Sequence, residues 1–482
     1  MGRRLYCLVL RQHQNLVFDL TEPVGKMTKK SKVLCAAAVS ISALMIPSIS
    51  SSESLKEAWA KAYSTNPVLA AERARLRSID EGVAQAKAGW RPTISASASS
   101  GAQYIDQDLK SNGSGSDTIM PTAILTEASQ PIYRGGRTDA DVKRASAEVQ
   151  AGRALLDKKE QEVLLAVGTA YMDVLRDQAV LELNDNNIKV LERQLEATKD
   201  RFSVGEVTRT DVAQAEARLA RARADRQTAF GNLEVSRASY ARQVGEPPLN
   251  LTQPGSISGT PQNLQVAVER ASKDNPNVRN ALSVHESARH SIDLILGELS
   301  PTVSLNGEVQ QSFETSRSVD STFSAKAIFK VSVPLYQSGS VSSRVRAAKQ
   351  SQSQKLLQVE DARRQSIEEA TKGWEQLTAT RSRIKSLETE IRANEIALEG
   401  VQQEALVGTR TVLDILDAEQ DLLDSRVNAV KASRDEYVAI LTLHKAVGGL
   451  TAADLTIDVP TYDPDKNLKA VQNRAFGTNL QD

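Results

Sequence analysis

The sequence predicts a mainly α-helical protein with a membrane β-barrel, built from a duplicated unit of long coiled-coil helical hairpins and four β-strands per chain. Three observations predict this fold class. The chain repeats itself internally, each repeat contains long segments with heptad spacing, and each contains two segments in which polar and apolar residues alternate. Because four strands are too few to close a barrel within one chain, at least two chains must contribute strands.

The internal repeat covers most of the chain. Residues 54–101 align with 263–310 without a gap, and Pro-Ile-Tyr at 131–133 aligns with Pro-Leu-Tyr at 334–336. A repeat of this length indicates a duplicated structural unit rather than a short solenoid period. We therefore expect five segments: a leader with signal peptide (1–52), the first structural repeat (53–245), a linker (246–262), the second structural repeat (263–448) and an irregular C-terminal tail (449–482).

The leader has the residue order of a secretory signal peptide. Lys29, Lys30 and Lys32 precede an apolar run over 33–46 and a group of small residues, so we place the natural start at Met27. The alternative, a membrane anchor, fits less well because the run is shorter than the ~20 residues that a spanning helix needs. Both cysteines lie in the leader, so the exported chain is expected to have no disulfide and no cysteine metal site.

Composition and charge exclude several function classes. Aromatic residues make up 4% of the chain, which suits long helices with narrow apolar seams better than compact globules. Residues 1–52 carry seven of the 60 Lys and Arg and two of the 60 Asp and Glu, so 53 basic and 58 acidic side chains remain, a net charge of −5. A mildly acidic chain lacks the basic footprint of a nucleic-acid-binding protein. The sequence also has no phosphate-binding glycine loop and no nucleophile motif, so we expect no enzyme, no metal and no cofactor.

Each repeat begins with helices that asparagine and proline delimit. Asn66 and Asn275 are each followed by proline, and this order predicts an N-cap with proline at the first helical position, where its missing N–H costs nothing. These helices should end near Trp90 and Leu299, shortly before another proline in each repeat.

Two strands are expected next in each repeat. In the second repeat, residues 302–313 and 322–333 alternate between an apolar and a polar face, and their length suits a tilted transmembrane strand. The first repeat matches more weakly at 93–104 and 118–130, where Pro121 disfavours a continuous strand.

The longest segments have helical periodicity. Helices are expected over about 138–200 and 340–405, each roughly 95 Å long at 1.5 Å per residue. Their apolar residues recur every seven positions, a spacing that imposes a left-handed supercoil. A soluble coiled-coil scaffold is the plain interpretation of such heptads, but the signal peptide and the alternating strands count against it.

Short turns reverse each long helix. They fall at 202–210 and 405–413, and the second helices that they introduce should end near Val244 and Val447. The turns carry a shared pattern, Val-Gly-x-x-Thr-x-x-Asp, which begins at Val204 in the first repeat and at Val407 in the second.

Together these motifs resemble the TolC family of outer-membrane efflux channel proteins. The resemblance covers nearly all of 54–448 and rests on the duplication, the Asn-Pro helix starts, the Tyr-x-x-Gly elements after the second strands and the hairpin tips. Val-Gly-Thr-Arg-Thr at 407–411, followed by Asp-Ile-Leu-Asp-Ala at 414–418, is the most specific part. The resemblance implies a homotrimer, in which the strands of three chains form one outer-membrane barrel above a periplasmic tunnel of helices.

The resemblance assigns a gate to the tips. Asp414 and Asp417 lie three residues apart on one helix face and match family positions at the pore constriction, where rings of carboxylates attract cations. The plain alternative is that acidic side chains near a helix N-terminus are favoured by its dipole. Arg410 matches a position that links neighbouring hairpins, and Asp211 would be its partner in a gate ion pair. The sequence departs from the family archetype at Ala405, where the archetype has a tyrosine of the closing network.

The remaining site residues concern partners and permeation. On the polar side of the second-repeat strands, Glu308, Lys326 and Lys330 should face the barrel lumen, while the apolar side faces outer-membrane lipid; simple solvation is the alternative. The resemblance implies that the tips bind a periplasmic adaptor (membrane fusion) protein, which joins the channel to an inner-membrane RND or ABC transporter. The adaptor-binding tip residues would be Val204, Gly205, Val407 and Gly408.

The predicted function is a passive duct in the outer membrane of a Gram-negative bacterium that extends into the periplasm. It would export drugs and/or proteins as the exit duct of a tripartite efflux or type I secretion system. The alternative is a periplasmic coiled-coil adaptor or scaffold without its own pore, but adaptors carry a single hairpin rather than a duplicated hairpin with paired strands.

Overall fold

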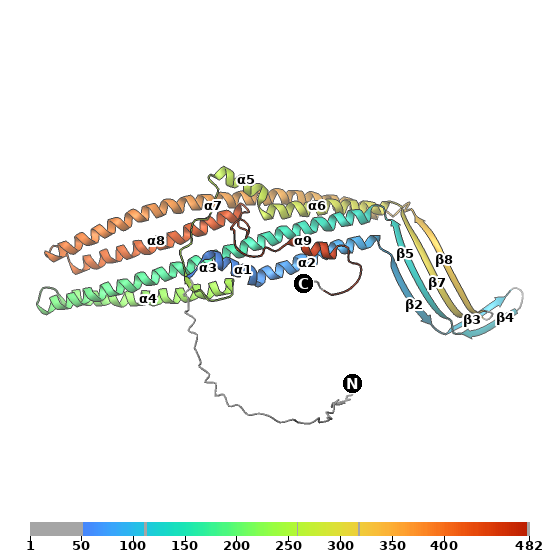
Figure 1. Ribbon diagram of the computed structural model, residues 1–482, viewed down its shortest axis with the longest axis horizontal. Helices are drawn as coiled ribbons and strands as arrows, with labels where there is room; N and C mark the ends of the chain where they lie inside the picture. The colour runs from blue at the N-terminus through green and yellow to red at the C-terminus, as the bar shows by residue number, and fades with distance from the viewer. Residues whose placement is uncertain (1–51, 110–112, 258, 317–318, 480–482) are drawn as a thin grey trace, which may run out of the picture. The chain divides into compact units, whose positions relative to one another are not determined.

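One succession of elements occurs twice along the chain (Figure 1). The computed structural model describes residues 52–109, 113–257, 259–316 and 319–479, and the predicted signal peptide with its start at Met27 lies outside them. The helices of the first repeat are α1 (Leu55–Thr65), α2 (Pro67–Lys87), the short 3-10 helix η1 (Ala88–Trp90), α3 (Arg137–Ser203) and α4 (Arg209–Val244). Those of the second repeat are α5 (Leu264–Asp274), α6 (Pro276–Leu296), the 3-10 helix η2 (Gly297–Leu299), α7 (Ser340–Leu406) and α8 (Val412–Ala446).

The expected helix boundaries are confirmed, and the asparagine caps do more than the sequence indicated. The Asn66 side chain accepts a hydrogen bond from the Val68 N–H at 2.9 Å and donates one to the Gln243 carbonyl oxygen at 3.0 Å. Asn275 likewise donates to the Ala446 carbonyl oxygen at 2.9 Å. Each asparagine therefore caps one helix and satisfies a carbonyl at the end of another, which fixes the start of α2 or α6 to the end of the hairpin.

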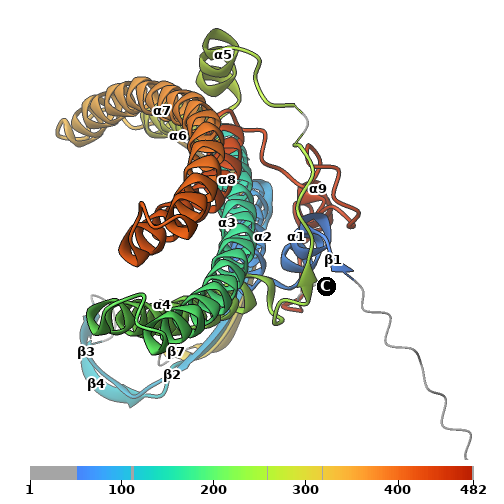
Figure 2. The ribbon, with the colours of Figure 1, turned by 90° about the vertical axis from the view of Figure 1, so that its left-hand side faces the viewer.

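The four long helices lie side by side in an arc. Figure 2 shows them in the order α7, α8, α3, α4, with one concave side. α3 and α7 have 67 residues each, which confirms the expected long helices. None of the helices in the described ranges has a stretch that is long and apolar enough to cross a membrane.

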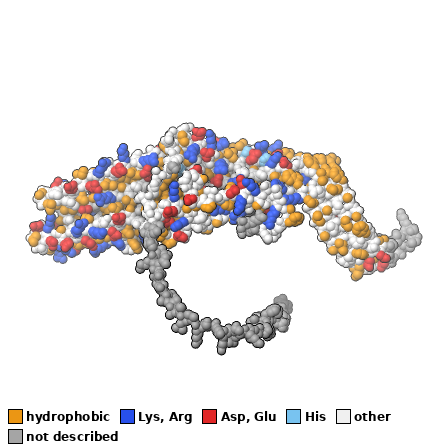
Figure 3. Space-filling view, in the orientation of Figure 1, with side chains coloured by type: hydrophobic (Ala, Val, Ile, Leu, Met, Phe, Trp, Pro, Cys, Tyr) orange, Lys and Arg blue, Asp and Glu red, His pale blue; other side chains and the backbone are white. Residues whose placement is uncertain are grey.

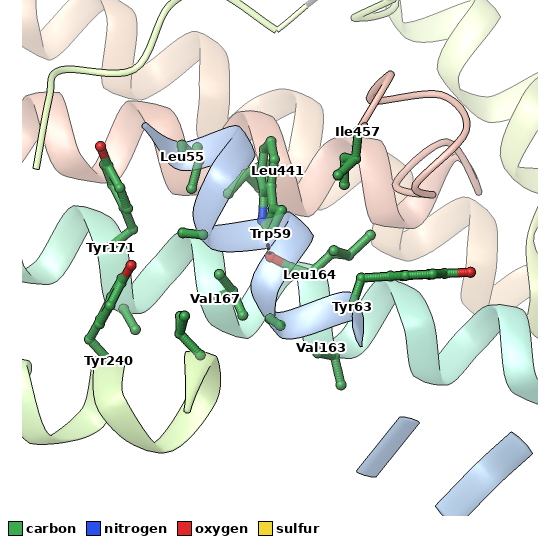
Figure 4. Packing of buried hydrophobic residues seen from close by; sticks show 14 of the residues in the cluster. Leu55, Trp59, Tyr63, Val163, Leu164, Val167, Tyr171, Tyr240, Leu441 and Ile457 are labelled. Carbon is green, nitrogen blue, oxygen red and sulfur yellow. Dashed lines mark hydrogen bonds between the residues drawn. The ribbon is translucent and has the colours of Figure 1, made fainter. Parts of the chain in front are cut away.

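The main core lies where α1 packs on α3, α4, α8 and the residues after α8. Trp59, Leu164 and Leu441 are buried there, and the Trp59 Nε1–H donates to the Leu164 carbonyl oxygen at 2.9 Å (Figure 4). Tyr171 and Tyr240 are also buried, with ring centroids 6.3 Å apart. This cluster joins both repeats, so the two hairpins share one core near their bases.

Four of the strands form one antiparallel sheet in the order β2-β5-β7-β8. Its members are β2 (Thr93–Ser100), β5 (Thr122–Tyr133), β7 (Thr302–Ser316) and β8 (Val319–Ser332). Each repeat contributes one inner and one edge strand. β7 and β8 confirm the two strands expected in the second repeat. Leu305 lies opposite Phe329 and Val309 opposite Ala325, so the predicted apolar side is continuous across β7 and β8. Hydrophobic side chains gather over these strands in Figure 3.

The expected first-repeat strands were wrong at their inner ends. Instead of two continuous strands, the structure has a separate ribbon of β3 (Gln103–Leu109) and β4 (Gly113–Ile119) between β2 and β5. Gly101 and Pro121 lie at the breaks, where the Gly101 N–H donates to the Pro121 carbonyl oxygen at 3.2 Å. Proline lacks the N–H of a ladder and glycine weakens it, so the hairpin divides at these residues.

The expectation of an irregular C-terminal tail was wrong in part, because the tail contains a helix. Helix α9 (Pro464–Val471) packs against α2, where the Asn467 amide donates to Asp80 at 2.8 Å, and its Asp465 pairs with Arg153 of α3. Periodicity could not predict α9, because a helix of eight residues is too short to display a periodic pattern. In the linker, β6 (Asn250–Leu251) pairs with β1 (Ser52–Glu53).

Candidate functional site at the hairpin tips

The two tips share one local structure. Gly205 and Gly408 have positive φ angles of 80° and 82°, and the long helices α3 and α7 end just before them. Thr208 and Thr411 then cap the N-termini of α4 and α8. A carboxylate three residues on completes each capping box. Asp211 accepts from the Thr208 N–H at 2.8 Å, and Asp414 accepts from the Thr411 N–H at 2.8 Å. Asp211 and Asp414 are therefore capping residues, whatever else they do.

Asp414 is held in its ionised form. The Thr411 backbone N–H, then the Thr411 hydroxyl, lowers the pKa of this exposed carboxyl below its usual value, and Arg410 adds to the effect. Hydrogen bonds to the charged form of an acid favour that form. The anionic form of this side chain is therefore favoured more than in an ordinary exposed aspartate.

Arg410 pairs within its own hairpin. Its Nε donates to Glu404 at 2.8 Å, and its Nη1 lies 4.0 Å from Asp414. Glu404 raises the pKa of the Arg410 guanidinium above its usual value. Within one chain the structure does not bring Arg410 to Asp211, so the predicted gate ion pair requires a neighbouring chain.

Asp417 is bound by the other hairpin. Its carboxylate accepts a hydrogen bond from Arg218 of α4, 199 residues away in sequence. Sequence reasoning missed Arg218; its only signal was its position seven residues after Asp211 on the same helical stripe.

An apolar seam lies beside this ion pair. Val412 and Leu416 of α8 are buried, Leu416 with only 2% of its surface exposed. They pack among residues of the first hairpin, namely Leu191, Leu195, Ala215, Leu219 and Ala222. The tip of the second hairpin is thus seated on the first by side-chain packing as well as by charge.

Comparisons with known proteins identify the fold and its context. A family model described as outer membrane efflux protein matches residues 59–246 and 267–449, which are most of both repeats. The chain belongs to this family.

Relatives cover nearly the whole chain. Outer membrane efflux protein BepC of Brucella suis biovar 1 is 32% identical over 461 residues, which cover 94% of this chain and 98% of BepC. Outer membrane protein TolC of Vibrio cholerae is 26% identical over 414 residues, covering 84% and 92%. Among solved structures, the outer membrane protein VceC from Vibrio cholerae superposes with a TM-score of 0.71 at 19% identity, covering 82% of this chain and 96% of VceC.

This efflux family member is therefore an exit duct in the outer membrane of a Gram-negative bacterium, a transport channel and not an enzyme. The resemblance to the TolC family and the predicted fold class are confirmed. The alternative of an adaptor without a pore is not favoured, because the family match spans both repeats.

The outermost residues of both tips are exposed in this efflux protein. Val204 and Val407 expose 70% and 76% of their surfaces beside Gly205 and Gly408. Each tip therefore ends in an exposed apolar side chain at a matched position.

The polar side of the sheet carries a row of charges. Glu308 lies opposite Lys326 and forms an ion pair with it at 2.7 Å, while Lys330 lies opposite Ser304. Glu127 of β5, which sequence reasoning missed because the first-repeat alternation is weak, lies opposite Glu308 on its other side. Among the described residues, no group of three or more His, Cys, Asp or Glu could hold a metal ion.

Proposed function

We propose that three copies of this chain form one outer-membrane channel that continues into a periplasmic tunnel. The observation that carries the proposal is the four-stranded sheet, whose edge strands β2 and β8 each pair on one side only within the described chain. An exposed edge with unpaired backbone groups is untenable in lipid, so β8 of one copy pairs with β2 of the next until the ring closes. The arc of four helices below the sheet then supplies one third of the tunnel wall.

The two sides of the sheet take opposite roles in this channel. Val309 and Phe329 lie on the apolar side and face lipid, whereas Glu308 and Lys330 lie on the polar side and face the lumen. Single cysteines at the four positions test this, since both native cysteines belong to the leader. A polar maleimide should label the Glu308 and Lys330 positions in intact membranes and spare the other two. Equal labelling at all four would refute the arrangement.

The tips form the periplasmic gate, and Asp414 and Asp417 form its constriction. Three chains place rings of carboxylates at the entrance, and such rings attract cations. Replacing both aspartates with alanine removes two charges from every chain, so purified channels in planar bilayers should lose cation preference and block by polycations. Unchanged selectivity and block would mean that the constriction lies elsewhere.

In the closed trimer, Arg410 of one chain links to Asp211 of a neighbour as the gate ion pair. Arg410→Ser should raise conductance in planar bilayers and leave the cation preference unchanged. A wild-type conductance in this variant would remove Arg410 from the gate.

The tip valines bind a periplasmic adaptor, and this adaptor joins the duct to an inner-membrane RND or ABC transporter. Drugs or secreted proteins reach the duct through that transporter. Val407→Asp should abolish export in cells while leaving the conductance of the purified channel unchanged. Val235→Asp, at a similarly exposed valine in the last third of α4, is the matched control and should export normally. Normal export by the Val407 variant would remove the tips from adaptor binding.

A further inference from the structure

In the conformation described here, both constriction carboxylates already have partners. Asp414 accepts the Thr411 N–H and hydroxyl, each at 2.8 Å, which are bonds inside its own helix start. Asp417 instead accepts from Arg218 of the first hairpin. The two aspartates, three residues apart on one helix face, are thus bound in different ways: movement of α8 as a body preserves the first set of bonds and breaks the second.

Ion pairs between the two hairpins are few. Among the described residues, two join α3 or α4 to α7 or α8: Arg218 with Asp417, and Asp173 with Arg434 at 2.8 Å. The second lies 17 helical residues further from the tip on α8, which is roughly 25 Å. Arg410, by contrast, stays within its own hairpin through Glu404. Near the tip, Arg218 is therefore the charged side chain that ties the described hairpins of one chain together.

The place of this ion pair relative to the apolar seam matters. Leu416, next to Asp417 in sequence, is buried against the first hairpin, and Val412 one turn earlier is buried there too. The seam seats α8 on α3 and α4, and the ion pair closes its edge. Any opening in which the second tip leaves the first separates Arg218 from Asp417.

We propose that Arg218 couples gating to ion selectivity in this channel. In the closed arrangement it holds the α8 tip against α4 and neutralises Asp417. When the tip moves away, the same step breaks the ion pair and releases the carboxylate into the entrance. The cation-selecting charge at 417 is therefore present in the open gate and masked in the closed one. This inference rests on the proposed function, because it assigns a partner and a regulation to the proposed constriction.

The test uses purified full-length channels in planar bilayers. Both Arg218→Ser and Asp417→Asn break the ion pair, so both should raise the open-state population, by about 1.4-fold to fivefold for each exposed pair. Their selectivities should diverge. Because Asp417 is already released in the open wild type, Arg218→Ser should keep the cation preference of the open channel and increase the fraction of channels that polycations can block, whereas Asp417→Asn should reduce both cation preference and block.

A matched control removes the same charge without touching the link between hairpins. Arg223 pairs with Glu192 of α3 at 2.8 Å inside the first hairpin, so Arg223→Ser should leave open-state population and selectivity near wild type. The exchange variant R218D/D417R restores the pair in reverse. It should close as the wild type does and, once open, show reduced cation preference, because an arginine is now released into the entrance.

The outcomes separate two kinds of failure. If Arg218→Ser behaves like Arg223→Ser, or if it lowers cation preference as Asp417→Asn does, the coupling role of Arg218 is wrong. If the wild type and all variants fold and assemble alike, yet none conducts, the proposed channel function itself fails.

Discussion

The first helices of the two hairpins have the same length and differ in their surroundings. α3 and α7 both have 67 residues, but buried residues occur along most of α3 and are sparse on α7. α3 contacts α1, α2, α4, α6 and α8, whereas α7 contacts α5, α6 and α8. At one matched position, Ala154 of α3 is 1% exposed and Leu357 of α7 is 69% exposed. The comparison teaches that duplication preserved helix length while burial diverged: α3 lies in the core of its own chain, whereas α7 keeps exposed apolar side chains, which we propose pack against another copy in the assembled channel.

The largest effect should come from the core side of this comparison. Leu164→Ala removes a fully buried side chain of α3 and should lower the free energy of unfolding by about 2–5 kcal/mol. Its match on α7, Ile367, is only half-buried, so Ile367→Ala should lower it by less. Urea unfolding in detergent, followed by tryptophan fluorescence, measures both. Equal losses would mean that α7 is as fully packed as α3 in the assembly.

The surface side of the comparison is tested at Leu357. Leu357→Asp should weaken assembly, because a charge would be placed in the surface proposed to pack against the neighbouring copy. The ratio of trimer to monomer on a semi-native gel measures this. Phe476→Asp is the control, since Phe476 is still more exposed but lies in the tail. A stable trimer of the Leu357 variant would show that this surface of α7 is not an interface between copies.

The sequence reveals those parts of this structure that repeat or have long periods. The long helices, the asparagine caps and the strands of the second repeat were predicted because their patterns run over many residues or recur in both halves. The Arg218–Asp417 pair was out of reach, since it joins residues 199 apart and the one local signal of its arginine, a position seven residues after Asp211, does not indicate a partner. The β3–β4 ribbon and α9 were missed because they are too short for a period to show. The roles of the tip residues came from family resemblance, and the structure adds that Asp211 and Asp414 also serve as caps.

The asparagine caps remain alike in the two repeats, so removing either one should lower the free energy of unfolding by the same small amount. Asn66→Ala and Asn275→Ala each remove a helix cap and should each lower the free energy of unfolding by about 0.5–2 kcal/mol. Asn66→Asp retains the oxygen that caps the helix but cannot donate to the Gln243 carbonyl oxygen. The fall in the free energy of unfolding of this variant therefore measures the bond to Gln243 alone. The same urea titration applies. A loss confined to one repeat would show that the two caps have diverged as the helices have.

The smallest effect concerns pH at the second tip. Because the pKa of Asp414 is lowered in the folded state, its stabilising contribution is present above the unfolded-state pKa and is lost only as pH falls through the folded value. Amide hydrogen exchange at Thr411 should therefore keep its protection at about pH 5, above the pKa of an ordinary aspartate. Asp414→Asn should exchange faster at neutral pH. Loss of protection in the wild type already at mildly acidic pH would contradict this.

The central ladder of the sheet has a consequence for how the protein acquires its structure. β5 and β7 come from different repeats, and the bond between Ser129 and Asn306 joins residues 177 apart. As the chain is synthesised, β5 therefore has only one of its two partner strands until the linker and the first third of the second repeat have been made. Pairing between such distant segments closes a long loop and is slow compared with helix formation. The hairpin of α3 and α4 has every residue it needs long before then, so we expect the helical half to fold first and the sheet to be the rate-limiting step of biogenesis.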